Sequence, residues 1–118
     1  MAKKNEFVEH LLDLLAGFGP VQARAMFGGY GIYKDECMFA LVVDDALFFK
    51  ADERTRPDFE ALGLPPFSYK KKDREISLSY YQAPDEALED PAAMHQWARK
   101  AHAAALRATR KKKKTFFR

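Results

Sequence analysis

The segment Arg24-Ala-Met-Phe-Gly-Gly-Tyr-Gly-Ile-Tyr33 contains three glycines within four positions. Such a run is typical either of a loop that wraps a phosphate or of a strand that bends. A dinucleotide-binding loop needs the pattern G-x-G-x-x-G ahead of a helix, but Gly29-Tyr-Gly31 is followed by Lys34 where the last glycine would stand. A P-loop needs Gly-Lys-Ser/Thr, which the chain lacks. We therefore predict a bend, a bulge or a close backbone approach within a strand.

The segments around these glycines have the length and residue types of β-strands. Residues 38–43 are apolar throughout, which favours a central strand, and residues 75–80 alternate between apolar and polar side chains. Short acidic connectors separate the first three strands, as in hairpins. The five expected strands are residues 26–33, 38–43, 47–51, 67–71 and 75–80.

Two segments contain residues that typically start and end short helices. Residues 5–16 place apolar side chains at helical spacing, with Asn5 as the N-cap and Gly17 as the stop. Residues 55–63 begin with Thr55, which is expected to cap the helix through its hydroxyl.

A third, longer helix is expected from Pro91 to about residue 110, after a linker or single helical turn over 84–90. The element order α-β(3)-α-β(2)-α predicts an α+β fold of two layers, with helices on a five-stranded antiparallel sheet. The expected buried stripe of the last helix is Met94, Trp97, Ala101, Leu106 or Ala105, and Ala108.

Composition indicates one domain, residues 1–109, followed by a basic tail, residues 110–118. Of the 118 residues, 47% are hydrophobic, enough for a packed core. The single cysteine, Cys37, excludes an internal disulfide, fits a reducing cytoplasm and is expected as a buried apolar residue. The amphipathic start does not resemble a signal peptide, and the longest apolar run is too short to span a bilayer. We expect a cytoplasmic protein.

Charge is divided unevenly along the chain. Residues 1–106 carry all 17 acidic side chains and 13 of the 20 Lys and Arg, a net charge of −4, whereas residues 107–118 carry the other seven, a net charge of +7. The body is therefore mildly acidic. A case for nucleic-acid binding on overall charge depends on the last twelve residues.

No residues in the sequence assemble a catalytic, cofactor or metal site, so we expect a non-enzymatic protein. His95 and His102 lie seven positions apart on one predicted helix, about 10 Å in rise, which is too far to hold one metal ion. Both, and His10, are expected at the surface or at the rim of the core. Acidic pairs fall in predicted turns, and the serines on strands have no partner base.

The strongest local signal is the basic end of the last helix. Several cations recur there at three-, four- and seven-residue steps, and Phe116 and Phe117 follow. Such a set can neutralise phosphates and stack on bases without reading sequence, can bind an anionic membrane surface, or can be a solvated tail. The candidate nucleic-acid contacts are Lys100, Arg107, Arg110, Lys111, Lys112, Lys113 and Lys114.

Taken in blocks, the chain resembles the N-terminal domain of the TfoX/Sxy family from about Phe7 to Leu106. The blocks are the glycine segment, Met38-Phe-Ala-Leu, Leu47-Phe-Phe-Lys-Ala-Asp, and Ile76-Ser-Leu-Ser-Tyr-Tyr-Gln-Ala-Pro before a Trp-bearing helix. The family signature positions, expected to be structural, are Arg24, Met26, Phe27, Gly28, Gly29 and Gly31.

The resemblance implies a fold like that of secretion chaperones, and no catalytic residues to carry over. It implies a role in regulating DNA-uptake competence genes, together with a cyclic-AMP-responsive transcription activator. Relatives carry a second, helical C-terminal domain, so we expect a stand-alone domain of the N-terminal kind.

Two hypotheses follow. The first is a small regulatory protein that acts through protein contacts and through tail contacts with DNA. The second is an interaction module or homodimer without DNA contact, because the chain has more aromatic residues than its core can hold. The aromatic residues behind this argument are Tyr30, Tyr33, Phe48, Phe49, Tyr69 and Tyr81.

Overall fold

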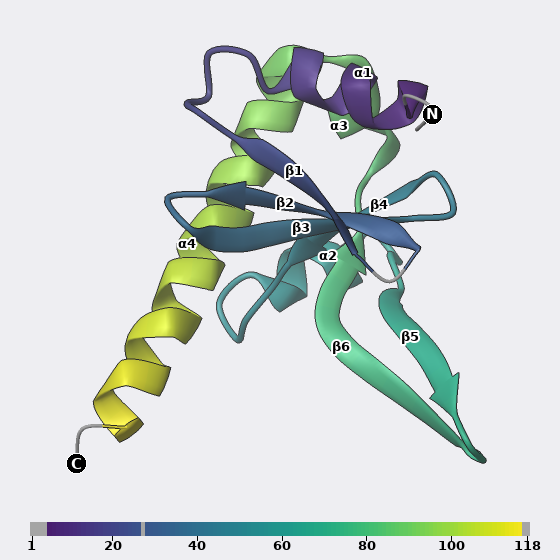
Figure 1. The fold of residues 1–118 in the computed structure, drawn as a ribbon, viewed down its shortest axis with the longest axis vertical. Coiled ribbons are helices and arrows are strands. Elements are labelled where there is room, and N and C mark those ends of the chain that lie inside the picture. Colours follow the sequence, from purple (N-terminus) through teal and green to yellow (C-terminus); the bar gives the residue numbers. More distant parts are fainter. Residues whose placement is uncertain (1–4, 27, 117–118) are drawn as a thin grey trace.

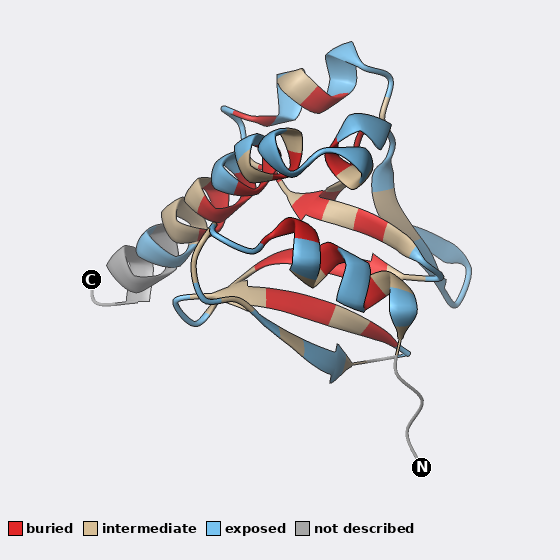
Figure 2. Cartoon of the chain, turned by 90° about the horizontal axis from the view of Figure 1, so that it is seen from above, coloured by how far each residue is buried: buried red, intermediate tan, exposed pale blue. Residues whose placement is uncertain are grey.

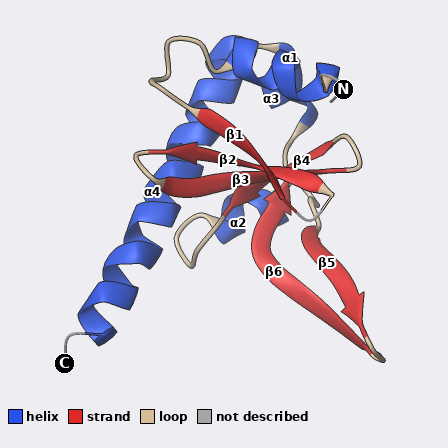
Figure 3. Ribbon diagram, viewed as in Figure 1, coloured by secondary structure: helices blue, strands red, loops and turns tan. Residues whose placement is uncertain are grey.

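The computed structural model describes residues 5–26 and 28–116, with side chains as far as Arg110. It confirms the α+β class and the antiparallel sheet (Figures 1 and 3). The strands are β1 (Gln22–Met26), β2 (Gly29–Lys34), β3 (Cys37–Val43), β4 (Ala46–Lys50), β5 (Pro66–Lys71) and β6 (Arg74–Gln82). The helices are α1 (Glu6–Leu14), α2 (Arg56–Ala61), α3 (Asp85–Glu89) and α4 (Pro91–Phe116).

The glycine-rich segment forms the turn of a hairpin, with β1 before it and β2 after it. Met26 pairs with Gly29 across this turn, and Gly28 has a φ of +79°, a conformation that favours glycine. The predicted single strand over 26–33 is therefore wrong, and the sheet has six strands instead of five. The extra strand was missed because the apolar residues that alternate along Gln-Ala-Arg-Ala-Met are mostly alanines, a weak strand signal, and because the strand is half-exposed at the edge of the sheet.

The sheet has the order β1-β2-β3-β4-β6-β5, and the helices pack on one of its faces. Ala40 and Val42 of β3 and Phe49 of β4 point toward the helices, and buried residues gather between the two layers (Figure 2). The predicted two layers are thus present. The largest fully buried side chains are Phe39, Phe49, Phe59, Leu11, Ile32, Met94 and Val42.

Helix α1 begins as predicted at its cap. The Asn5 side chain accepts a hydrogen bond from the Val8 N–H at 3.1 Å, which satisfies one of the free donors of the first turn. Of the two alternatives predicted for residues 84–90, a linker or a single helical turn, the structure has the helical turn, as the short helix α3.

Helix α4 continues to Phe116, beyond the predicted end near residue 110. No glycine or proline interrupts the basic run, lysine is a good helix former, and cations suit a helix C-terminus. In the stripe facing the sheet, Met94, Trp97, Ala101 and Ala105 are buried, whereas Leu106 and Ala108 are only half-buried. No helix in the described part of the chain is long and apolar enough to cross a membrane.

The β5–β6 hairpin departs from the predicted burial of one face. Tyr80 is 9% exposed, but Leu78 on the same face is 37% exposed. The difference arises because β4 pairs only with Tyr80 to Gln82 of β6. The outer part of the hairpin therefore projects from the body as a two-stranded ribbon (Figure 1).

Candidate functional site

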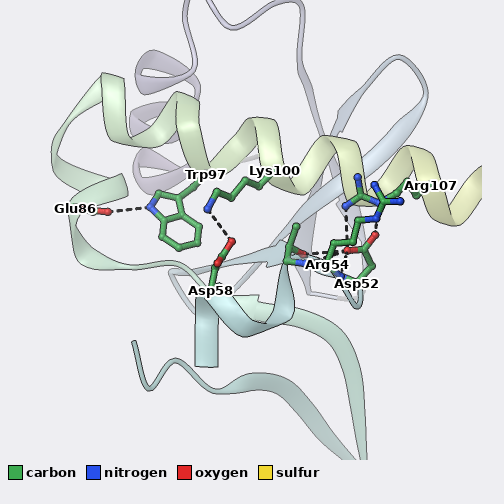
Figure 4. Close-up of polar contacts among 8 residues, drawn as sticks. Asp52, Arg54, Asp58, Glu86, Trp97, Lys100 and Arg107 are labelled. Atoms are coloured by element: carbon green, nitrogen blue, oxygen red, sulfur yellow. Dashed lines mark hydrogen bonds and ion pairs between the residues drawn. The ribbon is translucent and has the colours of Figure 1, made fainter. Parts of the chain in front are cut away.

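A carboxylate at the end of β4 holds the C-terminal half of α4. Arg107 donates from Nε to Asp52 Oδ2 at 2.5 Å and from Nη2 to Oδ1 at 3.1 Å (Figure 4). Oδ1 also accepts the backbone N–H groups of Arg54 and Thr55. These hydrogen bonds, Arg107 first among them, lower the pKa of the Asp52 carboxyl to about 2. The pair therefore stays ionised and ties α4 to the start of α2.

The same aspartate starts α2, which corrects the predicted role of Thr55. The Thr55 side chain makes no cap hydrogen bond to the helix. Its Oγ1 instead accepts the backbone N–H of Asp52 at 3.0 Å, while Asp52 accepts the N–H of Thr55. The exchange resembles a capping box, with the acidic residue in front.

A second set of contacts holds α4 about two to three turns earlier. Lys100 Nζ lies 2.8 Å from Asp58 Oδ2 of α2 and 4.8 Å from the centre of the Trp97 ring. Trp97 Nε1 donates to Glu86 Oε2 of α3 at 3.0 Å (Figure 4). Acidic side chains of the short helices thus bind one side of α4.

These contacts divide the predicted basic face. Lys100 and Arg107 have carboxylate partners within the domain, so a phosphate would have to compete with Asp58 and Asp52 for them. Arg110 is exposed. The side chains of Lys111, Lys112, Lys113 and Lys114, like Phe116 and Phe117, lie outside the described residues.

Substituting Arg107→Gln is expected to lower the free energy of unfolding at neutral pH by about 1–2 kcal/mol, allowing for solvent screening of a pair on the surface. Because the folded pKa of Asp52 is depressed, its contribution is present above the unfolded pKa near 4 and is lost as the pH falls toward about 2. The difference between variant and wild type in thermal unfolding should therefore shrink below about pH 4.

The matched control is Lys100→Gln, because the Lys100–Asp58 side chains are 43% and 44% exposed, against 29% and 24% for Arg107–Asp52. Its cost should be below about 1 kcal/mol. An Arg107→Gln variant as stable as Lys100→Gln at neutral pH would contradict this prediction.

Two of the signature glycines, Gly29 and Gly31, lie on β2 at positions where an added Cβ would meet neighbouring atoms. A Cβ on Gly29 would stand 2.2 Å from the backbone oxygen of Val42, a distance that no side chain rearrangement relieves. A Cβ on Gly31 would meet the flexible ends of Met38 and Met26 instead, at 2.6 and 2.9 Å. A strand, not a helix, follows these glycines.

Arg24 lies beside this segment, paired with Gly31 across β1 and β2. Its guanidinium stands 4.4 Å from the centre of the Tyr33 ring and 3.7 Å from Glu36. Arg24 and the ring thus cover part of the sheet face that carries no described helix. Phe27, the remaining signature residue, lies outside the described residues.

One of the three histidines, His102, occupies a different place from that predicted. His102 is buried, with 9% of its surface exposed, and its Nε2 lies 3.2 Å from the Lys34 carbonyl oxygen. His95 is half-buried and meets the Leu14 carbonyl oxygen at 3.0 Å. The prediction of a surface or rim position fits His10 and His95 and is wrong for His102, which packs against the end of β2 and the turn after it.

Cys37 is half-buried, not buried as predicted, and its Sγ lies 3.6 Å from Thr109 Oγ1. Among the described residues, no three His, Cys, Asp or Glu side chains are placed to hold a metal ion.

Aromatic side chains also occur on the face of the sheet opposite the helices. Phe48 packs against Phe67 with ring centres 5.2 Å apart, and Phe67 lies 6.2 Å from Tyr69, which is 42% exposed. Of the six aromatic residues behind the interaction hypothesis, Phe49 alone is fully buried, and the others are half-buried or exposed.

A second group of cations, which was not predicted as a site, lies at the tip of the β5–β6 hairpin. These residues were taken only as strand ends and a turn. The signal was available, because four of five consecutive positions are basic. The group consists of Lys70, Lys71, Lys72 and Arg74.

Fold and surface together define a small α+β domain with helices on one face of its sheet and cations on two projecting elements. Residues 13–105 match the TfoX N-terminal domain family, and the chain belongs to this family. The predicted recognition is therefore confirmed.

Three curated relatives show the extent of the similarity. DNA transformation protein TfoX1 of Aliivibrio fischeri is 28% identical over 86 residues, which are 73% of this chain and 41% of the relative. Protein Sxy of Escherichia coli is 35% identical over 78 residues, 64% of this chain and 36% of the relative. DNA transformation protein TfoX of Haemophilus influenzae is 30% identical over 88 residues, which are 72% of this chain and 41% of the relative. The chain thus spans about two fifths of the relatives' length.

Proposed function

We propose that this domain is a non-enzymatic regulatory protein of the DNA-transformation type, which contacts DNA without sequence preference through the basic end of α4. Two of the relatives carry the name DNA transformation protein. A role in regulating DNA uptake, with a transcription activator as protein partner, follows from that kinship and is part of the proposal.

The main observation in favour of the DNA contact is the path of α4. The helix runs on to Phe116 and leaves the body of the domain (Figure 1). No acidic residue follows Arg107 in the sequence. Lys100 and Arg107 bind Asp58 and Asp52 within the domain. We therefore assign the phosphate contacts to the cations that follow them on α4, which are Arg110, Lys111, Lys112, Lys113 and Lys114.

Lys100 and Arg107 then have a different task in the complex. Their ion pairs hold α4 on α2 and on the end of β4, so that the helix leaves the body in a defined direction. Preorganisation of this kind reduces the entropy lost on binding.

A salt titration against duplex DNA tests the helix contact. The five cations at the end of α4 should contribute about −4 to −5 to the slope of log K against log salt. Replacing the four lysines 111–114 by glutamine keeps the length of the helix and should reduce that slope by about 3 to 4. Deletion of residues 110–118 should reduce it further.

The matched control changes two basic residues elsewhere, with Arg54→Gln in the turn before α2 and Arg99→Gln on α4, both exposed in the structure. This variant should keep nearly the full slope. Equal DNA binding by the wild type and by the chain lacking residues 110–118 would remove α4 from the proposed function.

A second candidate is a protein-interaction module, as a homodimer or with another partner. The exposed Tyr69 and Leu78 on the sheet face without a described helix favour it. Sedimentation at tens of micromolar measures self-association. A monomer that also lacks DNA affinity would leave both candidates without support.

A further inference from the structure

The β5–β6 hairpin extends well beyond the rest of the sheet. Its two strands pair as far as Lys71 and Arg74, whereas β4 reaches only Tyr80 to Gln82 of β6. Six residues of β6 therefore lie beyond the rest of the sheet, a length of about 20 Å at the rise of a strand. We call residues 66–82 the β5–β6 arm.

The tip of the β5–β6 arm carries an excess of cations. Lys70, Lys71, Lys72 and Arg74 are all exposed, and none has a side-chain partner among the described residues. Of the two acidic residues nearby, Glu75 accepts a hydrogen bond from Ser68 at 2.9 Å, and Asp73 lies in the turn. This arrangement differs from α4, where Lys100 and Arg107 are neutralised by carboxylates.

One face of the β5–β6 arm combines cations with apolar surface. The cross-strand pairs Tyr69–Ile76 and Lys71–Arg74 place these four side chains on the same face, two positions apart. Leu78 continues that face toward the body. Tyr69 and Leu78 are 42% and 37% exposed. A partner for this face has to be anionic and has to present apolar surface as well.

The arm of a second copy of this chain does not meet those conditions. A symmetric contact between two arms would bring four unpaired cations against four, which is repulsive. Nucleic acid supplies both parts of the match, because phosphates carry the charge while sugars and bases offer apolar contact.

The position of the β5–β6 arm fits the same partner. Its tip and the C-terminal end of α4 project at the same end of the molecule, on opposite sides of the body (Figure 1). An anionic ligand as long as duplex DNA can meet both projections. The major groove is about 12 Å wide and admits a two-stranded β-ribbon.

We propose that the β5–β6 arm is a second nucleic-acid contact of this domain, which lies along the groove of duplex DNA while Lys70, Lys71, Lys72 and Arg74 neutralise phosphates. The inference rests on the proposed function and adds a site to it. The aromatic and apolar face of the arm then packs on the walls of the groove.

The test compares charge-matched variants of the full chain. Lys71→Gln with Arg74→Gln should reduce the slope of log K against log salt by about 2, and neutralising all four arm cations by about 3 to 4. The control, Arg54→Gln with Arg99→Gln, removes the same charge from exposed positions off the arm and should change the slope by less than about 0.5. Circular dichroism and the melting temperature establish that each variant is folded.

Measuring the tail variant of the previous section in parallel separates the two DNA contacts. If the arm variants show the same salt dependence as the control, while replacing lysines 111–114 by glutamine reduces the slope of log K against log salt, the arm proposal is wrong and the helix contact stands. If the arm variants lose slope and the tail variant does not, the arm proposal stands and the helix contact fails.

Two ligands identify the occupant of the arm. Binding of the wild type should be tighter to duplex DNA than to single-stranded DNA of equal length, and the arm variants should reduce the duplex affinity by tenfold or more at low salt. Equal arm-dependent binding to polyglutamate would point to an acidic protein segment and overturn the proposal. An arm effect confined to the single strand would do the same.

Discussion

Replacing Gly29 by alanine is expected to lower the free energy of unfolding by about 3 kcal/mol or more, at the upper end of the usual cost of overpacking. The added Cβ would stand 2.2 Å from the backbone oxygen of Val42. That oxygen belongs to β3, so relief requires β2 and β3 to separate and weakens their hydrogen bonds. The midpoint of urea unfolding, with an unchanged m-value, measures the loss.

Two other glycines serve as matched controls. Gly63 has a φ of +72° but no atom within 4 Å of its Cβ position, so Gly63→Ala should cost only the strain of the backbone, about 1–2 kcal/mol. Gly31→Ala meets flexible methionine ends, which can move. A loss for Gly29→Ala no larger than that for Gly63→Ala would show that the close approach to β3 is not needed.

Replacing Phe59 by alanine is expected to cost about 3–5 kcal/mol, the usual loss for a fully buried aromatic side chain. Phe59 is 0% exposed, its ring is stacked at 5.4 Å on Tyr81, and it lies 5.0 Å from Trp97. The side chain thus joins α2 to β6 and to α4. Urea unfolding, followed by the fluorescence of the single tryptophan, measures the loss.

Phe67→Ala is the matched control, because Phe67 is an aromatic residue that is only half-buried, at the base of the β5–β6 arm. It should cost clearly less than Phe59→Ala. Phe59→Ala should also loosen the packing of α2, which carries Asp58, and so weaken the Lys100–Asp58 ion pair. The losses in melting temperature of Phe59→Ala and Lys100→Gln should then not add in the double variant. Equal costs for the two phenylalanines would contradict the central role of Phe59.

Much of the fold could be predicted because the signals act within a few residues. The cap at Asn5, the turn at residues 72–73 and the alternation before Tyr80 all depend on local backbone geometry. The same holds for the helical spacing that buries Met94 and Trp97. These signals were enough for the α+β class and for most element positions.

The candidate site was harder to predict, because its contacts join distant parts of the chain. Arg107 and Asp52 are 55 residues apart, and Lys100 and Asp58 are 42 apart. Helical spacing places both cations on one face of α4, but it contains no information on what that face meets. The acidic body and the basic helix are therefore partly neutralised against each other, which the division of charge along the sequence does not reveal.

The sequence alone determined an α+β domain with one core and a cationic C-terminal end. It also showed that the glycine segment has a structural role in the backbone. These features could be predicted because propensity and periodicity are properties of short stretches. The pairing of residues 22–26 as a sixth strand, the burial of His102 and the projection of the β5–β6 arm arose from packing between elements. Whether a lysine is neutralised or exposed depends on which carboxylate the fold brings within about 4 Å, since Coulomb interactions weaken steeply with distance in water.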